Sequence, residues 1–444
     1  MNVQLIKDTV ESYKELILSA ERYIWAHPET GFKEVMTTEY LVAEYEKLGY
    51  KLMRPSDITG FTTEIDTGRP GPTLLILGEL DSILCPSHPE ANKETGAVHS
   101  CGHHAQSAAL LGIAAALTNK ELLEGLSGKI RLCAVPAEEL LEIEYRQGLY
   151  DKGIIRYFGG KSEFLRRGYF DGVDLAFMVH TAKNFASMQG SVGCIAKSII
   201  YKGKAAHAGG SPQNGINAVY AASTGLAAAN ALRETFRERD LIRFHPIVTF
   251  GGSMVNAIPE EARIESYVRG KTFEAIVREN KKINRALTGA ALSIGANIEI
   301  VDQPGYAPLE NSKDMIEVAR EAHALLGLEG EFHVDPGYST GSTDMGDLSQ
   351  IMPVVHPYCG GAKGQSHGND YYIEDPVKAC VTSAAWQIIM ASLLLENGGE
   401  RAKKIVENYT PIFNSAKEFL DYQDAIRCSG DRIVYNDGEA IVKL

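Results

Sequence analysis

The sequence has no excess of positive charge and no long apolar run, and each absence excludes a class of partner. The chain has 444 residues, with 44 Lys and Arg against 57 Asp and Glu, so its formal net charge is −13. Because an acidic chain cannot neutralise a phosphate backbone, we expect no nucleic-acid partner and no binding to an anionic membrane. No run approaches the roughly 18 apolar residues of a membrane span. The N-terminus has early acidic residues, which is not typical of a signal peptide.

The sequence also lacks the cysteine pattern of a disulfide-bonded protein. Its cysteines are odd in number and widely scattered, at positions 85, 101, 133, 194, 359, 380 and 428. This usage is typical of a reducing compartment, so we expect a cytoplasmic protein. We find no internal repeat, no low-complexity tract and no Gly-rich phosphate loop. The chain is too long for one ordinary core, so we expect two domains.

One stretch combines a thiol and an imidazole at the start of a predicted helix. Cys101 and His103 stand two positions apart in the segment His99-Ser-Cys-Gly-His103, and an Ala- and Leu-rich run follows as far as Leu117. That run contains no Pro, which favours a helix. A thiolate and a neutral imidazole together suit zinc or a similar borderline metal. Two ligands do not complete a site, so further donors are needed elsewhere.

Three short apolar runs, typical of buried strands, each end on side chains that can bind metal or move a proton. The first run leads to Glu79 and Asp81, the second to Glu138 and Glu139, and the third to His180. Sites in open α/β sheets form outside the carboxyl ends of the strands, so we expect these side chains to meet. The runs cover residues 72–78, 129–135 and 174–179.

The Glu138-Glu139 pair has a simple alternative interpretation as a solvated turn, and His180 alone could be an ordinary strand-end histidine. Adjacent side chains at a strand exit point in different directions. One carboxylate can therefore bind a metal while the other faces a metal-activated water and takes its proton. The coincidence of three such strand ends favours this second interpretation.

Residues 191–303 have a different pattern from the rest of the chain. Strand-like, helical and loop segments follow one another in the order β-α-β-β-α-β, which predicts a ferredoxin-like α+β domain. We therefore expect a catalytic domain in two parts, 1–190 and 304–444, interrupted by this inserted domain. The catalytic domain should be α/β, with a central mixed sheet.

Five segments in this order and spacing resemble the aminoacylase/hippuricase-type amidohydrolases of metallopeptidase clan MH, relatives of auxin-amide hydrolases and p-aminobenzoyl-glutamate hydrolase. The resemblance covers roughly residues 20–395. The matching segments are His27-Pro-Glu-Thr-Gly-Phe-Lys-Glu34, His99-Ser-Cys-Gly-His103, Pro136-Ala-Glu-Glu139, Gly203-Lys-Ala-Ala-His207 and Gly252-Ser-Met-Val-Asn-Ala-Ile-Pro259.

The resemblance implies a di-metal aminopeptidase-like fold whose inserted domain acts as a lid and dimerisation surface. It implies two divalent ions per chain, zinc or manganese, with Glu138 as the general base. His207 would stabilise the oxyanion, in relatives from the partner subunit of a homodimer, and Asn256 and Arg269 would hold the substrate. A loop histidine such as His207 could equally be an ordinary surface residue. The implied metal ligands are Cys101, His103, Glu139, His180 and His367.

The chain also departs from the family. Many members have Cys-Gly-His-Asp-x-His, whereas this chain has His104 in place of the Asp and Gln106 in place of the last His. Glu79-Leu-Asp81 stands where others have Asp-Met-Asp, and the stretch 142–167 lengthens the gap between Glu139 and His180. We expect that stretch to reshape the mouth of the pocket, and Asp81 or His104 to support the metal ligands indirectly.

These observations predict a metal-dependent amidohydrolase that cleaves the amide bond of an N-acyl or N-aroyl amino acid, such as a hippurate-like or p-aminobenzoyl-glutamate-like small molecule. A dipeptidase or a deacetylase could use the same site. A non-catalytic homologue that only binds a small ligand is a further alternative. The complete set of metal-binding and proton-transferring side chains argues against that last alternative, because a non-catalytic protein would not need them.

Overall fold

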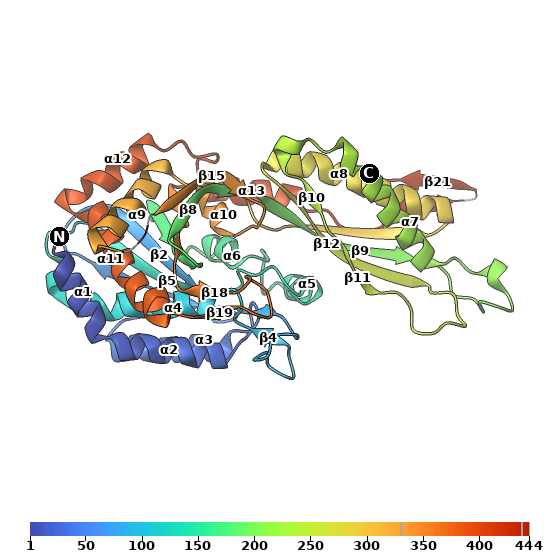
Figure 1. Cartoon of the computed structure of the whole chain (residues 1–444). Coiled ribbons are helices and arrows are strands. Elements are labelled where there is room, and N and C mark those ends of the chain that lie inside the picture. Colours follow the sequence, from blue (N-terminus) through green and yellow to red (C-terminus); the bar gives the residue numbers. More distant parts are fainter. Residues whose placement is uncertain (329, 331, 437, 444) are drawn as a thin grey trace.

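A five-stranded sheet forms the centre of the first body of the molecule, seen on the left of Figure 1. The computed structural model describes residues 1–328, 330, 332–436 and 438–443. The strand order is β1-β5-β2-β6-β16, and β1 alone runs antiparallel to its neighbour. The strands are β1 (Phe61–Asp66), β2 (Thr73–Glu79), β5 (Lys129–Val135), β6 (Leu175–Met178) and β16 (Val354–Val355).

The three predicted strands are confirmed as the middle of this sheet. β2 pairs in parallel with β5 on one side and with β6 on the other, and all seven residues of β2 are buried. A strand buried on both faces needs a continuous apolar sequence, which explains the three apolar runs. Because the three strands are parallel, their carboxyl ends lie at one edge of the sheet.

Helices cover both faces of this sheet and complete the largest apolar core. The apolar spacing of residues 3–26 in the sequence predicts one long helix, and this prediction is wrong in one respect, because the structure has two helices that break at Tyr13. The segment 377–395 is apolar and long enough to cross a membrane by composition, but 83% of its most apolar window is buried inside the protein. These elements are α1 (Val3–Ser12), α2 (Lys14–Ala26), α3 (Val35–Lys47), α4 (His103–Ala116), α9 (Lys313–Leu326), α10 (Met345–Ser349), η5 (Val377–Thr382), α11 (Ser383–Leu395) and α12 (Glu400–Asn408).

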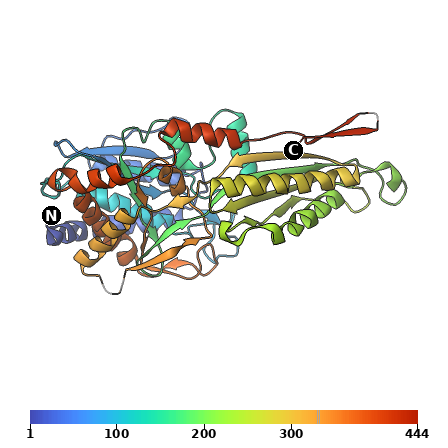
Figure 2. The same cartoon turned by 90° about the horizontal axis from the view of Figure 1, so that it is seen from above.

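The second body is an elongated antiparallel sheet with helices on one face (Figures 1 and 2). Its order β10-β12-β9-β13, with β11 also paired to β12, is the strand order of a ferredoxin-like unit and confirms the expected α+β insertion. Its elements are β9 (Gly193–Lys202), α7 (Ala218–Ala231), β10 (Arg243–Phe244), β11 (Ile247–Phe250), β12 (Glu261–Gly270), α8 (Phe273–Ile294) and β13 (Asn297–Pro304).

Three further segments join or flank the two bodies. The stretch 142–167 contains two helices, α5 (Ile143–Asp151), which contacts β9, and α6 (Gly160–Arg166), which contacts β5. A sheet beside the site combines β7 (His180–Thr181), β8 (Ala186–Ser191), β14 (Leu309–Glu310), β15 (His333–Ser339) and β17 (Tyr358–Cys359). The C-terminal part contains α13 (Ala416–Ile426) and a hairpin, and its residues 428–432 bond to β13. The hairpin and the remaining short pairs are β20 (Ile433–Asn436) with β21 (Glu439–Val442), β3 (Ile83–Leu84) with β4 (Ala97–Val98), and β18 (Ala362–Lys363) with β19 (Tyr372–Ile373).

Candidate metal centre

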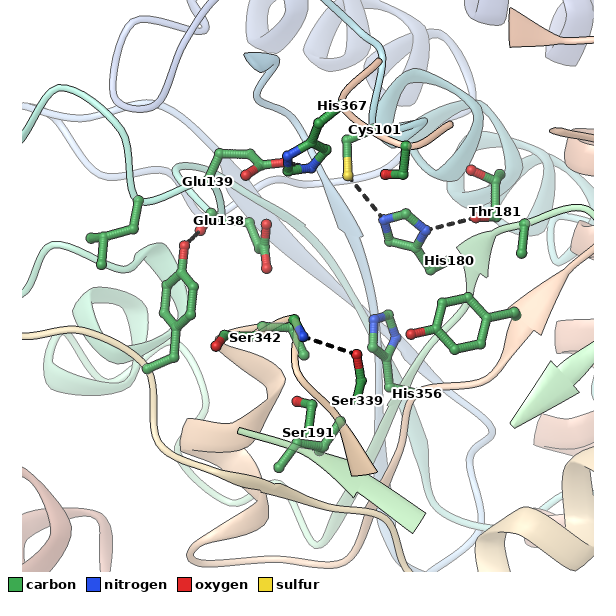
Figure 3. A pocket seen from close by; sticks show the side chains of 18 of the residues that line it. Cys101, Glu138, Glu139, His180, Thr181, Ser191, Ser339, Ser342, His356 and His367 are labelled. Atoms are coloured by element: carbon green, nitrogen blue, oxygen red, sulfur yellow. Dashed lines mark hydrogen bonds and ion pairs between the residues drawn. The ribbon is translucent and has the colours of Figure 1, made fainter. Parts of the chain in front are cut away.

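The carboxyl edge of the central sheet brings together two groups of metal-binding side chains that share Cys101. Within each group the donor atoms lie within 4.8 Å of one another. Figure 3 shows Cys101 between His180 and His367, with Glu139 against His367. The first group is Cys101, His103 and His180, and the second is Cys101, Glu139 and His367. All five predicted ligands therefore lie at one place in the fold.

Backbone and carboxylate contacts fix the orientation of the two histidine rings in the first group. The Nδ1 atom of His103 lies 2.9 Å from the carbonyl oxygen of Asp81 and 3.2 Å from its Oδ1. The Nδ1 atom of His180 lies 2.9 Å from the carbonyl oxygen of Thr181, and its Nε2 lies 3.4 Å from the Cys101 sulfur. Both rings thus bond to the protein through Nδ1 and turn Nε2 toward the site, as metal-binding histidines do.

Of the two residues expected to support the metal ligands indirectly, Asp81 and His104, it is Asp81 that contacts them. It is fully buried, and besides contacting His103 it accepts a hydrogen bond of 2.7 Å from the backbone N–H of Glu139. One carboxylate therefore positions a donor from each group. His104 points elsewhere, since its Nε2 lies 3.4 Å from Glu21 Oε1 and its ring packs against Trp25.

The residues fit a divalent cation in chemistry as well as in position. The Nε2 atom of His103 is buried and makes no hydrogen bond with any described residue, although Glu79 Oε2 lies 3.2 Å away. Burial alone would raise the pKa of the Cys101 thiol, but His103 and His180 lower it to about 5, which favours the thiolate. Thiolate, imidazole and carboxylate are together the donors of a borderline divalent metal.

Glu138 lies beside both groups and faces the same space as their donor atoms (Figure 3). Its Oε2 atom is 3.9 Å from His103 Nε2, and the residue is 6% exposed. Burial, with the negative charges of Glu79 and Glu139, raises the pKa of Glu138 well above its ordinary value. A carboxylate that prefers to hold a proton is suited to take one from water and pass it on.

A cavity of about 750 Å³ opens in front of these donors and contains Arg269 on its far wall. Arg269 extends from β12 of the second body and donates hydrogen bonds to Ser342 Oγ at 3.0 Å and to His245 Nε2 at 3.1 Å. The wall also contains Ser191 and Ser339. A guanidinium among hydroxyl groups can bind a carboxylate.

Two of the predicted site residues, His207 and Asn256, do not line this cavity. Both are exposed, and they lie together in the second body, where the N–H of Ala208 donates to the carbonyl oxygen of Asn256 at 3.0 Å. The Nδ1 atom of His207 accepts hydrogen bonds from the N–H groups of its own loop, of Gly209 at 3.2 Å and Gly210 at 2.8 Å. Within one chain they are not part of the metal centre.

A buried ion cluster that was not predicted from the sequence lies next to the two groups of donors. Lys161, from the stretch 142–167, is fully buried and lies between Glu79, at 2.6 Å, and Asp344. Gln106 also donates to Glu79 at 2.9 Å. Gln106 and the stretch 142–167 are both departures from the family pattern, and both contact the carboxylate of Glu79. No local motif marks Lys161, because its partners are 82 and 183 residues away.

His356 is a further site residue that was not predicted from the sequence. It could have been identified in the same way as His180, because side chains after the carboxyl ends of parallel strands meet. It follows β16 directly, is 3% exposed and lines the cavity. Its Nδ1 atom lies 2.8 Å from the carbonyl oxygen of Met178, which leaves Nε2 facing the cavity. Burial and the neighbouring His180 lower the pKa of His356 to about 4, so the ring is neutral.

Comparison with known proteins shows a family and several relatives that this chain resembles in sequence. The sequence model of peptidase family M20/M25/M40 matches residues 75–389. The chain is 30% identical to the Xaa-Arg dipeptidase of Mus musculus over 267 residues, which are 59% of this chain and 57% of that enzyme. It is 26% identical to the IAA-amino acid hydrolase ILR1-like 4 of Arabidopsis thaliana, over 78% of this chain and 77% of that protein.

A solved structure has a similar fold. It is the YXEP protein of Bacillus subtilis, described as a dinuclear metal binding peptidase. The TM-score is 0.63 at 22% sequence identity, and the match covers 87% of this chain and 99% of that one. At this identity the likeness concerns the fold, and it includes both bodies of the molecule.

Proposed function

The chain belongs to peptidase family M20/M25/M40, and from that premise we propose that it hydrolyses the amide bond of an N-acyl or N-aroyl amino acid. It is a metal-dependent hydrolase of amide bonds. One observation supports the proposal most strongly. Two donor groups that share Cys101 lie beside the free carboxylate of Glu138, at the edge of a cavity that contains an arginine.

We propose that Cys101, His103, Glu139, His180 and His367 hold two divalent ions, zinc or manganese, with Cys101 in contact with both. Bound there, such ions lower the pKa of a water molecule and polarise a carbonyl group. Glu138 takes the proton of the attacking water and later gives it to the amine that leaves. The neutral His356 and the hydroxyl-rich wall opposite leave room for an acyl group.

We propose that Arg269 binds the carboxylate of the substrate amino acid, whereas His207 and Asn256 act on a second copy of the chain. His207 is a hydrogen-bond donor suited to the oxyanion of the attacked carbonyl group. A homodimer through the inserted domain is supported by its edge strand β11, where Ile247, Val248 and Phe250 are all exposed. A single chain would then contain only part of each site.

We retain three expectations as part of the proposal. The inserted domain covers residues 191–303, and the catalytic domain covers 1–190 and 304–444. The protein works in a reducing, cytoplasmic compartment, which agrees with seven free thiols.

A dipeptidase or a deacetylase could use the same machinery, and the charge of the cavity distinguishes some of these substrates. Lys183 and Arg269 line it, and among the described lining residues the carboxylates are Glu138 and Glu139, which already serve the reaction. A leaving group with a cationic side chain therefore finds no free negative partner. This favours neutral or acidic amino acids over basic ones.

The test is a panel of amides, each assayed over a range of concentrations, with manganese or zinc supplied. It contains N-benzoyl-glycine, p-aminobenzoyl-glutamate, N-acetyl amino acids and a dipeptide that ends in arginine. We expect cleavage of N-acyl or N-aroyl substrates, with a KM that rises about tenfold or more in Arg269→Met. Cleavage of the arginine dipeptide alone would contradict the proposal. No cleavage of any amide would favour the ligand-binding alternative.

A further inference from the structure

The turn that carries Glu138 and Glu139 has an unusual backbone. Residues 136–139, here called the base turn, follow β5, and Ala137 within it has a φ angle of +55°. Residues with a side chain rarely adopt this left-handed conformation, which persists only where the surroundings impose it. The conformation of Ala137 decides in which directions the two following carboxylates point. What holds Ala137 therefore controls the geometry of the site.

Glu34 holds the N–H side of the base turn. Its carboxylate is fully buried, and Oε1 accepts a hydrogen bond of 2.8 Å from the N–H of Ala137. The other oxygen accepts a hydrogen bond of 2.6 Å from Thr59. Glu34 ends the motif of residues 27–34, to which the proposed reaction assigns no role.

Arg146 holds the carbonyl side of the same turn. It comes from α5, in the stretch 142–167, and is 1% exposed. Its guanidinium donates to the carbonyl oxygens of Ala137, at 3.4 Å, and of Glu139. A third bond reaches the carbonyl oxygen of Phe158. The planar guanidinium thus spans the base turn on both sides of Glu138.

Other segments pack closely against Arg146 and the base turn. A Cβ atom on Gly31 would lie 2.4 Å from the Arg146 guanidinium and 2.9 Å from Ala137 Cα. A Cβ atom on Gly160 would lie 1.6 Å from the carbonyl oxygen of Pro136. Phe32 also lies beneath Arg146, with its ring centre 5.5 Å from the guanidinium carbon. Glycine is therefore required at both positions where these segments approach the base turn.

We propose that Glu34 and Arg146 are positioning residues that together impose the left-handed conformation of Ala137 and so aim Glu138 at the reacting water and Glu139 at the metal. This inference rests on the proposed function for its kinetic consequence and on geometry for its structural one. It gives a role to the motif 27–34 and to the stretch 142–167. Neither residue touches the substrate.

The principal test is Arg146→Ala, which leaves a space of the size of guanidinium. We expect kcat to fall about 100-fold with KM little changed, and the affinity for added Mn²⁺ to fall about tenfold. Guanidinium at low millimolar concentration, far below denaturing levels, should restore part of kcat, whereas sodium chloride at equal ionic strength should not. Arg166→Ala is the matched control, because Arg166 pairs with Glu163 and does not contact the base turn.

Glu34 provides a second test should Arg146→Ala fail to fold. Glu34→Gln keeps an oxygen that can accept from Ala137, whereas Glu34→Leu removes it. We expect near-normal kcat in the first and a loss like that of Arg146→Ala in the second. Unchanged kcat and Mn²⁺ affinity per folded chain in Arg146→Ala or in Glu34→Leu would overturn the proposal. If the wild-type protein cleaves no amide, the Mn²⁺ affinities alone decide, which separates this inference from the proposed function.

Discussion

The two bodies of the molecule differ in how completely they build their part of the site. In the first body the donor atoms of each group lie within 4.8 Å of one another, and Asp81 and backbone carbonyl groups already orient several of them. In the second body His207 and Asn256 are exposed; His207 accepts hydrogen bonds from its own loop, and the carbonyl oxygen of Asn256 accepts one from Ala208. The proposed metal ligands thus lie together within one chain, whereas the proposed oxyanion donor, His207, lies outside the cavity of its own chain.

The largest loss of activity should come from a substitution of Glu138, which lies beside both groups of metal-binding side chains in the first body. We expect Glu138→Gln to lower kcat by about 10³-fold or more, since it removes the group that moves the proton. The metal content should not change, because Glu138 is not among the five proposed ligands. Glu139→Gln is the control and should lose bound metal. Metal loss in Glu138→Gln as well would make Glu138 a ligand.

His207→Ala should have the next largest effect and tests whether the second body acts across a dimer. We expect kcat to fall about 10²-fold with the metal content intact, as when an oxyanion donor is removed. Mixing this variant with Glu138→Gln in a refolded or co-expressed heterodimer should restore activity, because one of its two sites then has both residues. A mixture that stays inactive would mean that His207 acts within its own chain, or does not act.

The smallest effects on turnover, but clear ones on stability, should come from one buried aspartate in each body. Burial would raise the pKa of Asp302 in β13, but Lys197 holds it below its usual value. Asp302 therefore stabilises the folded chain above about pH 4, and this stability is lost as the pH falls through the lowered pKa. In Asp302→Asn the buried Lys197 loses its anionic partner, so we expect a loss of about 3 kcal/mol near neutral pH.

Asp347 makes the stability of the folded chain depend on pH in the opposite direction. Burial and then Asp344 raise the pKa of Asp347 to about 8. Between about pH 4 and this value the folded chain keeps a proton that the unfolded chain has lost, so the free energy of unfolding falls as the pH rises. Asp347→Asn should remove that fall and raise the melting temperature at alkaline pH. Melting curves of the wild type and of both variants from about pH 2 to about pH 9 check the two signs, because the Asp302 contribution changes below about pH 4 and the Asp347 contribution above it. A constant difference in melting temperature between wild type and variant over the whole range would contradict them.

The sequence predicted the parts of the molecule that depend on local pattern. Continuous apolar runs identified β2, β5 and β6, and the residues at their ends pointed to Glu139 and His180, because a parallel sheet brings those ends together. Cys101 and His103 were identified by the thiol and imidazole at the start of a helix, and His367 only by the resemblance to the family. The break at Tyr13 was missed, since the apolar spacing continues across it. Lys161, Arg146 and Glu34 were also missed as supports, because each meets partners that are distant in sequence or act through the backbone.

The central claim is that Cys101 contacts two divalent ions, and metal analysis of the purified protein tests it most directly. The account predicts about two ions of zinc or manganese per chain in the wild type, and a loss of both in Cys101→Ala because that variant removes the shared donor. Loss of amide hydrolysis should accompany the loss of metal. A wild type that binds no ion after manganese or zinc is supplied, or a Cys101→Ala variant that keeps two, would contradict it.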